Sequence, residues 1–197
     1  MQKHLLENLL QYVDFSEEEI ALLLSKLNTR IFKKNSFFLK EGEVCKHMAF
    51  INTGLMRAYY LKDGKEYIVS FVEEGNWVNE HSSFLTKTPS LFFIEALEDT
   101  EVLLLGYDDL QDLFCQYKSF ERFGRLIAEC QNYEISKRNN SLLLETPQER
   151  YQNFVKEKGK YINVLPLKYI ASYVGIEPES LSRIRNRLYG PRINRLT

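Results

Sequence analysis

The stretch Ala171-Ser172-Tyr173-Val174-Gly175-Ile176-Glu177-Pro178-Glu179-Ser180-Leu181-Ser182-Arg183-Ile184 places a glycine between two short helical patterns. Apolar residues recur at helical spacing before it, over 166–174, and after it, over 178–188. Gly175 can adopt the positive φ of a tight turn at little cost. Two short helices joined by such a turn are typical of a helix-turn-helix, in which the second helix enters the major groove of DNA.

The second helix carries polar residues suited to DNA. Those expected on its outer surface near the N-terminal end can read base edges, and they are Glu179, Ser180, Ser182, Arg183 and Asn186. Arginine pairs bidentately with guanine, and a carboxylate accepts from cytosine. Four arginines suited to phosphate contacts follow without another acid, namely Arg185, Arg187, Arg192 and Arg195. The alternative is a small helical bundle whose arginines face water or another protein.

The charge distribution favours DNA binding by the C-terminal part of the chain. From Thr146 onward there are ten basic and four acidic residues, which leaves 16 basic and 23 acidic residues before it. The two parts therefore carry +6 and −7, as expected for a polyanion-binding module joined to an acidic body. Thr146-Pro147-Gln148-Glu149 predicts a capped helix start and marks the boundary. We expect three regions: a sensor domain over 1–107, a long helix and hinge over 108–145, and a DNA-binding domain over 146–197.

Short runs rich in β-branched and aromatic residues follow one another between Thr29 and Leu105, separated by turn signals. This spacing predicts an antiparallel sandwich or barrel. Asp63-Gly64 is the clearest hairpin signal, because both residues tolerate positive φ. The chain before this region reads as helix, with a second helix starting at the capping-box pair Ser16 and Glu19. The expected fold class is α+β.

A single long helix is expected from Asp108 to about Leu144, where proline is absent. Phe123, Ile127 and Cys130 belong to an apolar stripe with a spacing close to 3.5. We expect this stripe to join two copies of the chain in a homodimer. The alternative is that it packs on its own sandwich.

Composition excludes several protein classes. The chain has 197 residues, of which 44% are hydrophobic, so it can fold around a core. It lacks the apolar run that a membrane span needs, and no signal peptide is apparent, so we expect a soluble cytoplasmic protein. Three scattered cysteines fit neither a disulfide framework nor an iron–sulfur cluster, and no spacing of the histidines suggests haem or metal. We expect no cofactor and no enzymatic activity; the alternative is an enzyme of the β-sandwich type that uses Glu80 and His81 as an acid–base pair.

Two motifs resemble one known family across nearly the whole length. Phe38–Glu43 followed by Met48–Arg57 is similar to the first half of a cyclic-nucleotide-binding jelly roll, and Ala171–Ile184 is similar to the helix-turn-helix of the Crp/Fnr transcription regulators. The resemblance implies a homodimer joined through the long helix, a palindromic operator in double-stranded DNA, and RNA polymerase as a further partner. It makes Glu179 and Arg183 the principal base readers and Ser180 a phosphate contact. Little sequence follows the recognition helix, so we expect little or no wing.

The resemblance also implies a departure from cyclic nucleotide binding. In Gly75–Phe92 the ribose-binding acid of the family matches Glu80, but Ser90 replaces its phosphate-binding arginine and Leu91 its hydroxyl residue. Charge-assisted bonds to a buried phosphate are worth roughly 1.5–3 kcal/mol each, so their loss makes binding in the usual mode unfavourable. Lys87 could substitute only from a shifted loop. We expect a modified pocket near Glu80, Trp77, Ser90 and Leu91 and an effector of unknown chemistry.

Overall fold

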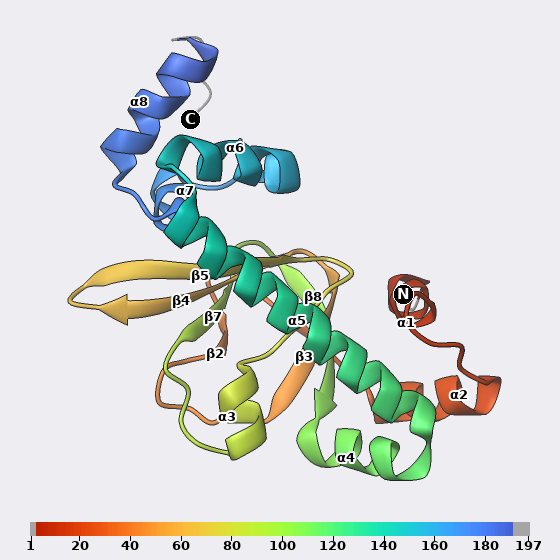
Figure 1. Ribbon diagram of the computed structural model, residues 1–197. Helices are drawn as coiled ribbons and strands as arrows, with labels where there is room; N and C mark the ends of the chain where they lie inside the picture. The colour runs from red at the N-terminus through yellow and green to blue at the C-terminus, as the bar shows by residue number, and fades with distance from the viewer. Residues whose placement is uncertain (1–2, 191–197) are drawn as a thin grey trace. The chain divides into compact units, whose positions relative to one another are not determined.

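The computed structural model describes residues 3–190 (Figure 1). Contacts divide the chain into two compact units. One comprises the chain up to Lys65 together with Val69–Cys130, and the other comprises Glu66–Ile68 together with the chain from Gln131 onward. None of the helices in the described part of the chain is both long and apolar enough to cross a membrane.

The first unit is built on a β-roll, as the sequence predicts. Within residues 3–190, eight strands form two four-stranded sheets, with the orders β1-β8-β3-β6 and β2-β7-β4-β5. Neighbouring strands such as β1 and β8, β3 and β8, or β4 and β7 pair antiparallel. The strands are β1 Asn28–Phe32, β2 Phe37–Leu39, β3 His47–Thr53, β4 Leu55–Lys62, β5 Lys65–Glu73, β6 Trp77–Val78, β7 Phe93–Ala96 and β8 Thr100–Gly106. Residues of β5 belong in part to the second unit.

Local signals determine where these elements begin and turn. Asp63 and Gly64 join β4 to β5 with φ values of 52° and 75°, so the hairpin prediction is confirmed. Helices α1 (Lys3–Leu10) and α2 (Glu17–Lys26) precede the roll. Ser16 and Glu19 form the predicted capping box at the start of α2, because each side chain bonds the other residue's backbone N–H.

The prediction of one helix from Asp108 is wrong at one residue. Tyr117 is extended, with φ −137° and ψ 127°, and separates α4 (Tyr107–Gln116) from α5 (Lys118–Leu144). The ring of Phe114 on α4 packs so closely on α5 that a Cβ at Gly124 would collide with it. A continuous helix would carry Phe114 away from Gly124. This contact between the two helices therefore accounts for the break.

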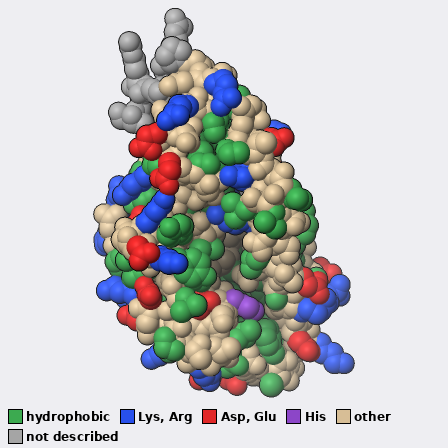
Figure 2. All heavy atoms as spheres, turned by 60° about the vertical axis from the view of Figure 1, so that its left-hand side comes forward, with side chains coloured by type: hydrophobic (Ala, Val, Ile, Leu, Met, Phe, Trp, Pro, Cys, Tyr) green, Lys and Arg blue, Asp and Glu red, His purple; other side chains and the backbone are tan. Residues whose placement is uncertain are grey.

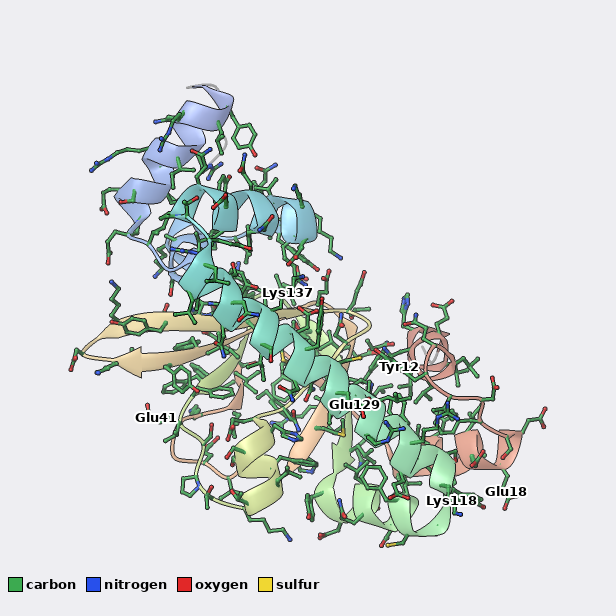
Figure 3. All side chains as sticks on the ribbon, in the orientation of Figure 1. Tyr12, Glu18, Glu41, Lys118, Glu129 and Lys137 are labelled. Carbon is green, nitrogen blue, oxygen red and sulfur yellow. The ribbon has the colours of Figure 1, made fainter. Side chains whose placement is uncertain are left out.

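The first part of α5 packs on the core of its own unit. Phe123 contacts the rings of Tyr12 and Trp77 at centroid distances of 5.8 and 6.2 Å, and Tyr12 lies beside α5 in Figure 3. Ile127 belongs to the same buried cluster, whereas Cys130 is exposed. Phe123 and Ile127, which the sequence analysis assigned to a dimer interface, are therefore used within the chain.

The second unit contains the remaining part of α5 and the helices α6 (Pro147–Lys158), α7 (Leu167–Val174) and α8 (Pro178–Tyr189), with a 3₁₀ turn at Gly159–Tyr161. The capping box predicted at Thr146 and Glu149 is present at the start of α6. Lys137 on α5, labelled in Figure 3, forms an ion pair with Glu157 on α6 at 2.6 Å. Residues 191–197, where a wing would begin, lie outside the described residues.

Candidate nucleic-acid interface

The turn between α7 and α8 is set by local hydrogen bonds. The backbone N–H of Ile176 donates to the carbonyl of Ala171 at 3.0 Å, and that of Gly175 donates to Ser172 at 3.2 Å. These two bonds are the Schellman arrangement, which requires a left-handed residue at the end of the helix. Gly175 supplies it with φ 77°, as the sequence predicts, and Pro178 opens α8.

Buried side chains hold α8 against the other helices of its unit. Leu181 and Ile184 are buried on its inner face. They belong to the apolar interior of the unit, which also contains Ile170 and Val174 of α7 and Tyr151 of α6. Because these contacts determine how α8 is rotated about its axis, they also determine which of its residues face water.

The opposite face of α8 carries most of the residues expected to read DNA. Glu179, Arg183 and Asn186 are exposed, and spacings of four and three residues place them on one side of the helix. Ser180 and Arg187 are exposed beside them, and Ser182 is half-buried. Neither Arg183 nor Arg187 forms an ion pair with any described residue, so both guanidinium groups are available to an anion. Arg192 lies outside the described residues.

Arg185 does not belong to this face. It is only 5% exposed, and its Nε has no hydrogen-bond partner among the described residues. Its charge acts on Tyr151, where it opposes the increase in pKa that burial causes. Spacing accounts for the position, since Arg185 lies four residues after Leu181 and three before Leu188, on the apolar stripe of α8. Arg185, expected from the sequence to contact phosphate, is therefore buried in this structure, away from the exposed face of α8.

Arg150 has a structural position that its place in the sequence does not reveal. Its Nε donates to the carbonyl of Val174 at 2.7 Å and its Nη1 to the carbonyl of Glu145 at 2.6 Å. These bonds connect the end of α7 to the end of α5. Arg150 thus supports the turn before α8, although in the sequence it counts only as one of ten basic residues. A charged residue in the first turn of a helix gives no sign of such long-range bonds.

In the first unit, the residue matching the ribose-binding acid is committed to the protein's own backbone. Glu80 is 8% exposed, and its carboxylate accepts from the N–H groups of Ser82 at 3.1 Å and Ser83 at 2.7 Å. It is the N-cap of α3 (His81–Thr86). Its charge also raises the pKa of Tyr60, for which burial is the larger cause.

The other three residues expected near a modified pocket have different environments. Ser90 is buried, and its Oγ donates to the carbonyl of Phe92 at 2.8 Å. Leu91 beside it is 71% exposed. Trp77 packs on Phe50 in the core, and its Nε1 donates to Asn8 at 3.1 Å. Trp77 is thus a core residue, and no bond links these three side chains to Glu80.

A buried ion pair in the roll was missed from the sequence. Arg57 on β4 and Glu95 on β7 face each other in register, with 2.9 Å from Nε and 2.6 Å from Nη2 to Oε2 of Glu95. The guanidinium also lies 4.2 Å from the centre of the Tyr59 ring. The sequence shows one charged residue inside each of two apolar strands. Only the register between the two strands shows that Arg57 and Glu95 meet. Glu95 thus balances the charge of Arg57 inside the roll.

Comparisons with known proteins agree with this architecture. Residues 29–117 match the family described as cyclic nucleotide-binding domain. No curated protein shows a significant match. Among solved structures, FixK2 from Bradyrhizobium japonicum has 20% identity and a TM-score of 0.73 over 85% of this chain and 86% of that one. The catabolite activator protein of Thermus thermophilus has 19% identity and a TM-score of 0.59 over 92% and 86%.

A third structure carries the family name itself. A transcriptional regulator assigned to the Crp/Fnr family from Eubacterium rectale has 15% identity and a TM-score of 0.69, over 89% of this chain and 84% of that one. At these identities the likeness concerns the fold. Residues 29–117 thus match the cyclic nucleotide-binding domain family, and the chain shares its fold with Crp/Fnr regulators.

Proposed function

We propose that this protein is a dimeric transcription regulator that binds a specific DNA sequence through α8. The observation that carries the proposal is the exposed face of α8, where Glu179 and Arg183 lie on one side of a helix whose other side is buried. Arg183 has the geometry to pair with guanine, and Glu179 can accept from cytosine. Ser180 and Arg187 beside them serve phosphate groups.

Basic side chains elsewhere in the second unit support the proposal. Lys156 on α6 and Lys168 on α7 are exposed. They add to the cations of α8 without reading bases, since phosphate contacts supply affinity that is independent of sequence. The positive balance of this part of the chain, counted from the sequence, agrees with this division of roles.

The second half of α5 supports a homodimer. Tyr133 is 66% exposed and Leu144 is 81% exposed, and with Leu126 and Cys130 they fall on the alternating three- and four-residue spacing of a coiled-coil seam. The two seam positions between Tyr133 and Leu144 are the polar residues Lys137 and Asn140. Large apolar side chains at such positions are covered when two copies pair. The proposed seam thus excludes Phe123 and Ile127, which are buried in their own unit. Two-fold symmetry then predicts operator half-sites about 34 Å apart.

The first unit is proposed to sense something other than a cyclic nucleotide bound in the usual mode. Ser90 and Leu91 provide no cation for a phosphodiester, and the carboxylate of Glu80 already caps α3. An effector of this unit then has a different chemistry.

The test is selection from a random duplex library with the purified protein and no added nucleotide, followed by a salt titration on the enriched sequence. We expect a palindromic consensus with half-sites one helical turn apart, and affinity that falls steeply with salt. The Arg183→Ala variant is the control in this selection, because without the base-reading arginine it should not enrich the same consensus. Failure to enrich any sequence, together with no salt-dependent binding to DNA, would instead favour a module whose C-terminal helices contact protein.

A further inference from the structure

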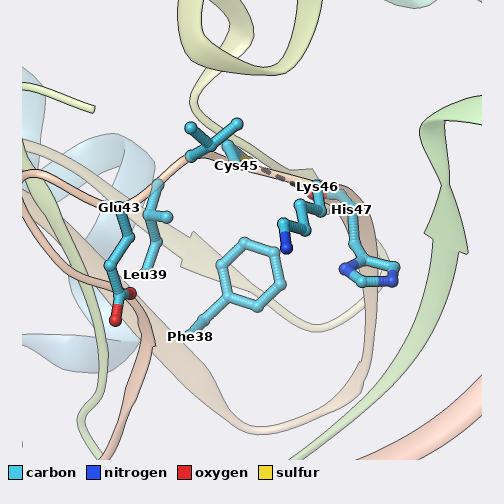
Figure 4. Close-up of a pocket in the computed structure, with 7 residues that line it drawn as sticks. Phe38, Leu39, Glu43, Cys45, Lys46 and His47 are labelled. Atoms are coloured by element: carbon cyan, nitrogen blue, oxygen red, sulfur yellow. Dashed lines mark hydrogen bonds between the residues drawn. The ribbon is translucent and has the colours of Figure 1, made fainter. Parts of the chain in front are cut away.

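A hollow of about 440 Å³ lies between β2 and the start of β3 in the first unit (Figure 4). Its volume lies within the roughly 300–1,000 Å³ typical of small-molecule sites. None of the residues assigned above to DNA or cyclic nucleotide lines it. On the face drawn in Figure 2, Lys and Arg side chains lie among Asp and Glu side chains and do not form a patch of one sign.

The hollow has an apolar side. Phe38, Leu39 and Val44 line it, and Leu39 is buried while the other two are half-buried. The ring of Phe38 packs edge-on against Phe32 with centroids 5.9 Å apart, which holds the ring in place. An aromatic surface that is fixed and partly open to solvent offers a flat contact to an apolar group.

The charged side chains at the hollow that have no ion-pair partner among the described residues are positive. The carboxylate of Glu43 accepts from the N–H of Lys40 at 3.0 Å, so this acid closes a turn. Lys46 and the neighbouring Arg30 form no ion pair with any described residue. Burial, followed by the charges of Lys46 and Arg30, lowers the pKa of His47, so its imidazole is neutral at pH 7. In Figure 4 the ammonium group of Lys46 is directed toward the ring of Phe38.

The wall of the hollow is held by bonds to another part of the roll. Val44 forms an isolated bridge with Pro89, and the N–H of Cys45 donates to Ser83 Oγ at 2.9 Å. The N–H of Ser90 donates to the carbonyl of Glu43 at 2.8 Å. A hollow that is already formed loses little entropy when it binds a ligand. The Cys45 thiol is buried, which raises its pKa, so it remains protonated and contributes surface, not a nucleophile.

We propose that this hollow binds small monocarboxylates with an apolar body. The body lies against Phe38, and the carboxylate pairs with the ammonium of Lys46. Among the residues that line the hollow, Lys46 is the one with a free positive charge, since Arg30 lies beside the hollow and does not line it. Its ammonium balances one negative charge, whereas a phosphate dianion would leave a charge unmatched. The proposal goes beyond the regulator function and does not depend on DNA binding. It concerns residues outside Glu80–Leu91, although hydrogen bonds connect the two regions.

The test is calorimetric titration of the full chain with 3-phenylpropionate, its neutral amide and 3-phenylpropylamine. We expect the carboxylate to bind at least tenfold more tightly than the amide and the amine. Lys46→Gln should remove this preference, and Lys46→Arg should keep it. Lys40→Gln is the matched control, because the Lys40 ammonium lies over Phe37 and does not line the hollow. Phe38→Leu should weaken the carboxylate and the amide alike, with folding checked by circular dichroism.

Three results of this titration would overturn the proposal. They are equal affinity for the carboxylate and the amide, equal effects of Lys40→Gln and Lys46→Gln, and absence of binding by all three compounds at millimolar concentration. Phenyl phosphate serves as a further probe, and tighter binding of this dianion than of the carboxylate would also contradict the assignment. Because the experiment contains no DNA, its failure is distinct from failure of the proposed regulator function.

Discussion

The outer face of α8 and the segment from Glu80 to Leu91 both carry polar residues, but they differ in what those residues already contact. Arg183 and Arg187 on α8 extend into solvent without ion-pair partners among the described residues. Glu80 and Ser90 are buried and bonded to backbone groups of their own segment. A residue that matches a binding position in a sequence contributes to binding only if its polar atoms remain available.

The largest expected effect concerns the buried charge of the roll. Arg57→Met should lower the free energy of unfolding by about 3–5 kcal/mol, because it leaves Glu95 buried without its partner. Urea unfolding measures this loss. The exposed pair Arg125–Glu129, 2.6 Å apart, is the control, and Arg125→Met should cost less than about 1 kcal/mol. The double variant Arg57→Met with Glu95→Leu should recover most of the loss, and similar losses in the single and double variants would contradict a paired role.

The next effect separates base reading from phosphate contact on α8. Arg183→Ala should cost about 1–3 kcal/mol of binding free energy on the preferred operator and relax its specificity. Arg187→Ala should weaken binding to all duplexes about equally and reduce the salt slope by about one. Binding to the operator and to a scrambled duplex across a salt series measures both. Equal losses for both variants on every sequence would show that the two roles are assigned wrongly.

A smaller effect tests whether Glu80 acts as a cap. Glu80→Ala should lower stability by about 0.5–2 kcal/mol, since two N–H groups of α3 lose their acceptor. Glu80→Asp should retain part of the cap, and Ser82→Ala should have little effect. Thermal unfolding checks the three variants, and equilibrium dialysis with cyclic AMP checks that none of them, nor the unchanged chain, binds it. Unchanged stability of Glu80→Ala combined with cyclic AMP binding by the native chain would reverse this interpretation.

The smallest effect is expected at Arg185. Replacing a buried arginine that has an unsatisfied Nε by methionine removes a cost of burial while keeping most of the apolar contact. Arg185→Met should therefore leave the operator affinity and the salt slope unchanged and leave stability equal or higher. Arg187→Ala, two residues away, is the comparison for the salt slope. A reduced slope in Arg185→Met would show that Arg185 reaches phosphate when DNA is bound.

Elements determined by neighbouring residues were predictable. The capping boxes at Ser16 and Thr146, the Asp63-Gly64 hairpin and the positive φ of Gly175 all appear where the sequence places them. Each depends on bonds or steric limits within about five residues. The short apolar runs separated by turn residues, which indicate an antiparallel roll, are also a local signal that recurs along the chain.

Other features depended on segments that are distant in sequence. The break at Tyr117 follows from the packing of Phe114 on Gly124, and the burial of Phe123 follows from Tyr12 and Trp77. An amphipathic stripe shows that one side of a helix is covered, but not what covers it. The sequence pattern therefore predicts an apolar stripe on α5, but it does not show that Phe123 and Ile127 within that stripe are covered by their own unit.

The sequence by itself determined the order of the elements, their caps and turns, and the charge contrast between the two parts of the chain, because these depend on composition and on nearby residues. Only the tertiary structure decided that Arg185 faces inward while Arg183 faces outward, that Arg57 meets Glu95, and that Glu80 caps α3. The physical reason is that burial and pairing are properties of surfaces brought together by folding. An arginine that faces water can bind an anion, whereas an arginine buried in a core costs free energy unless its polar atoms are paired.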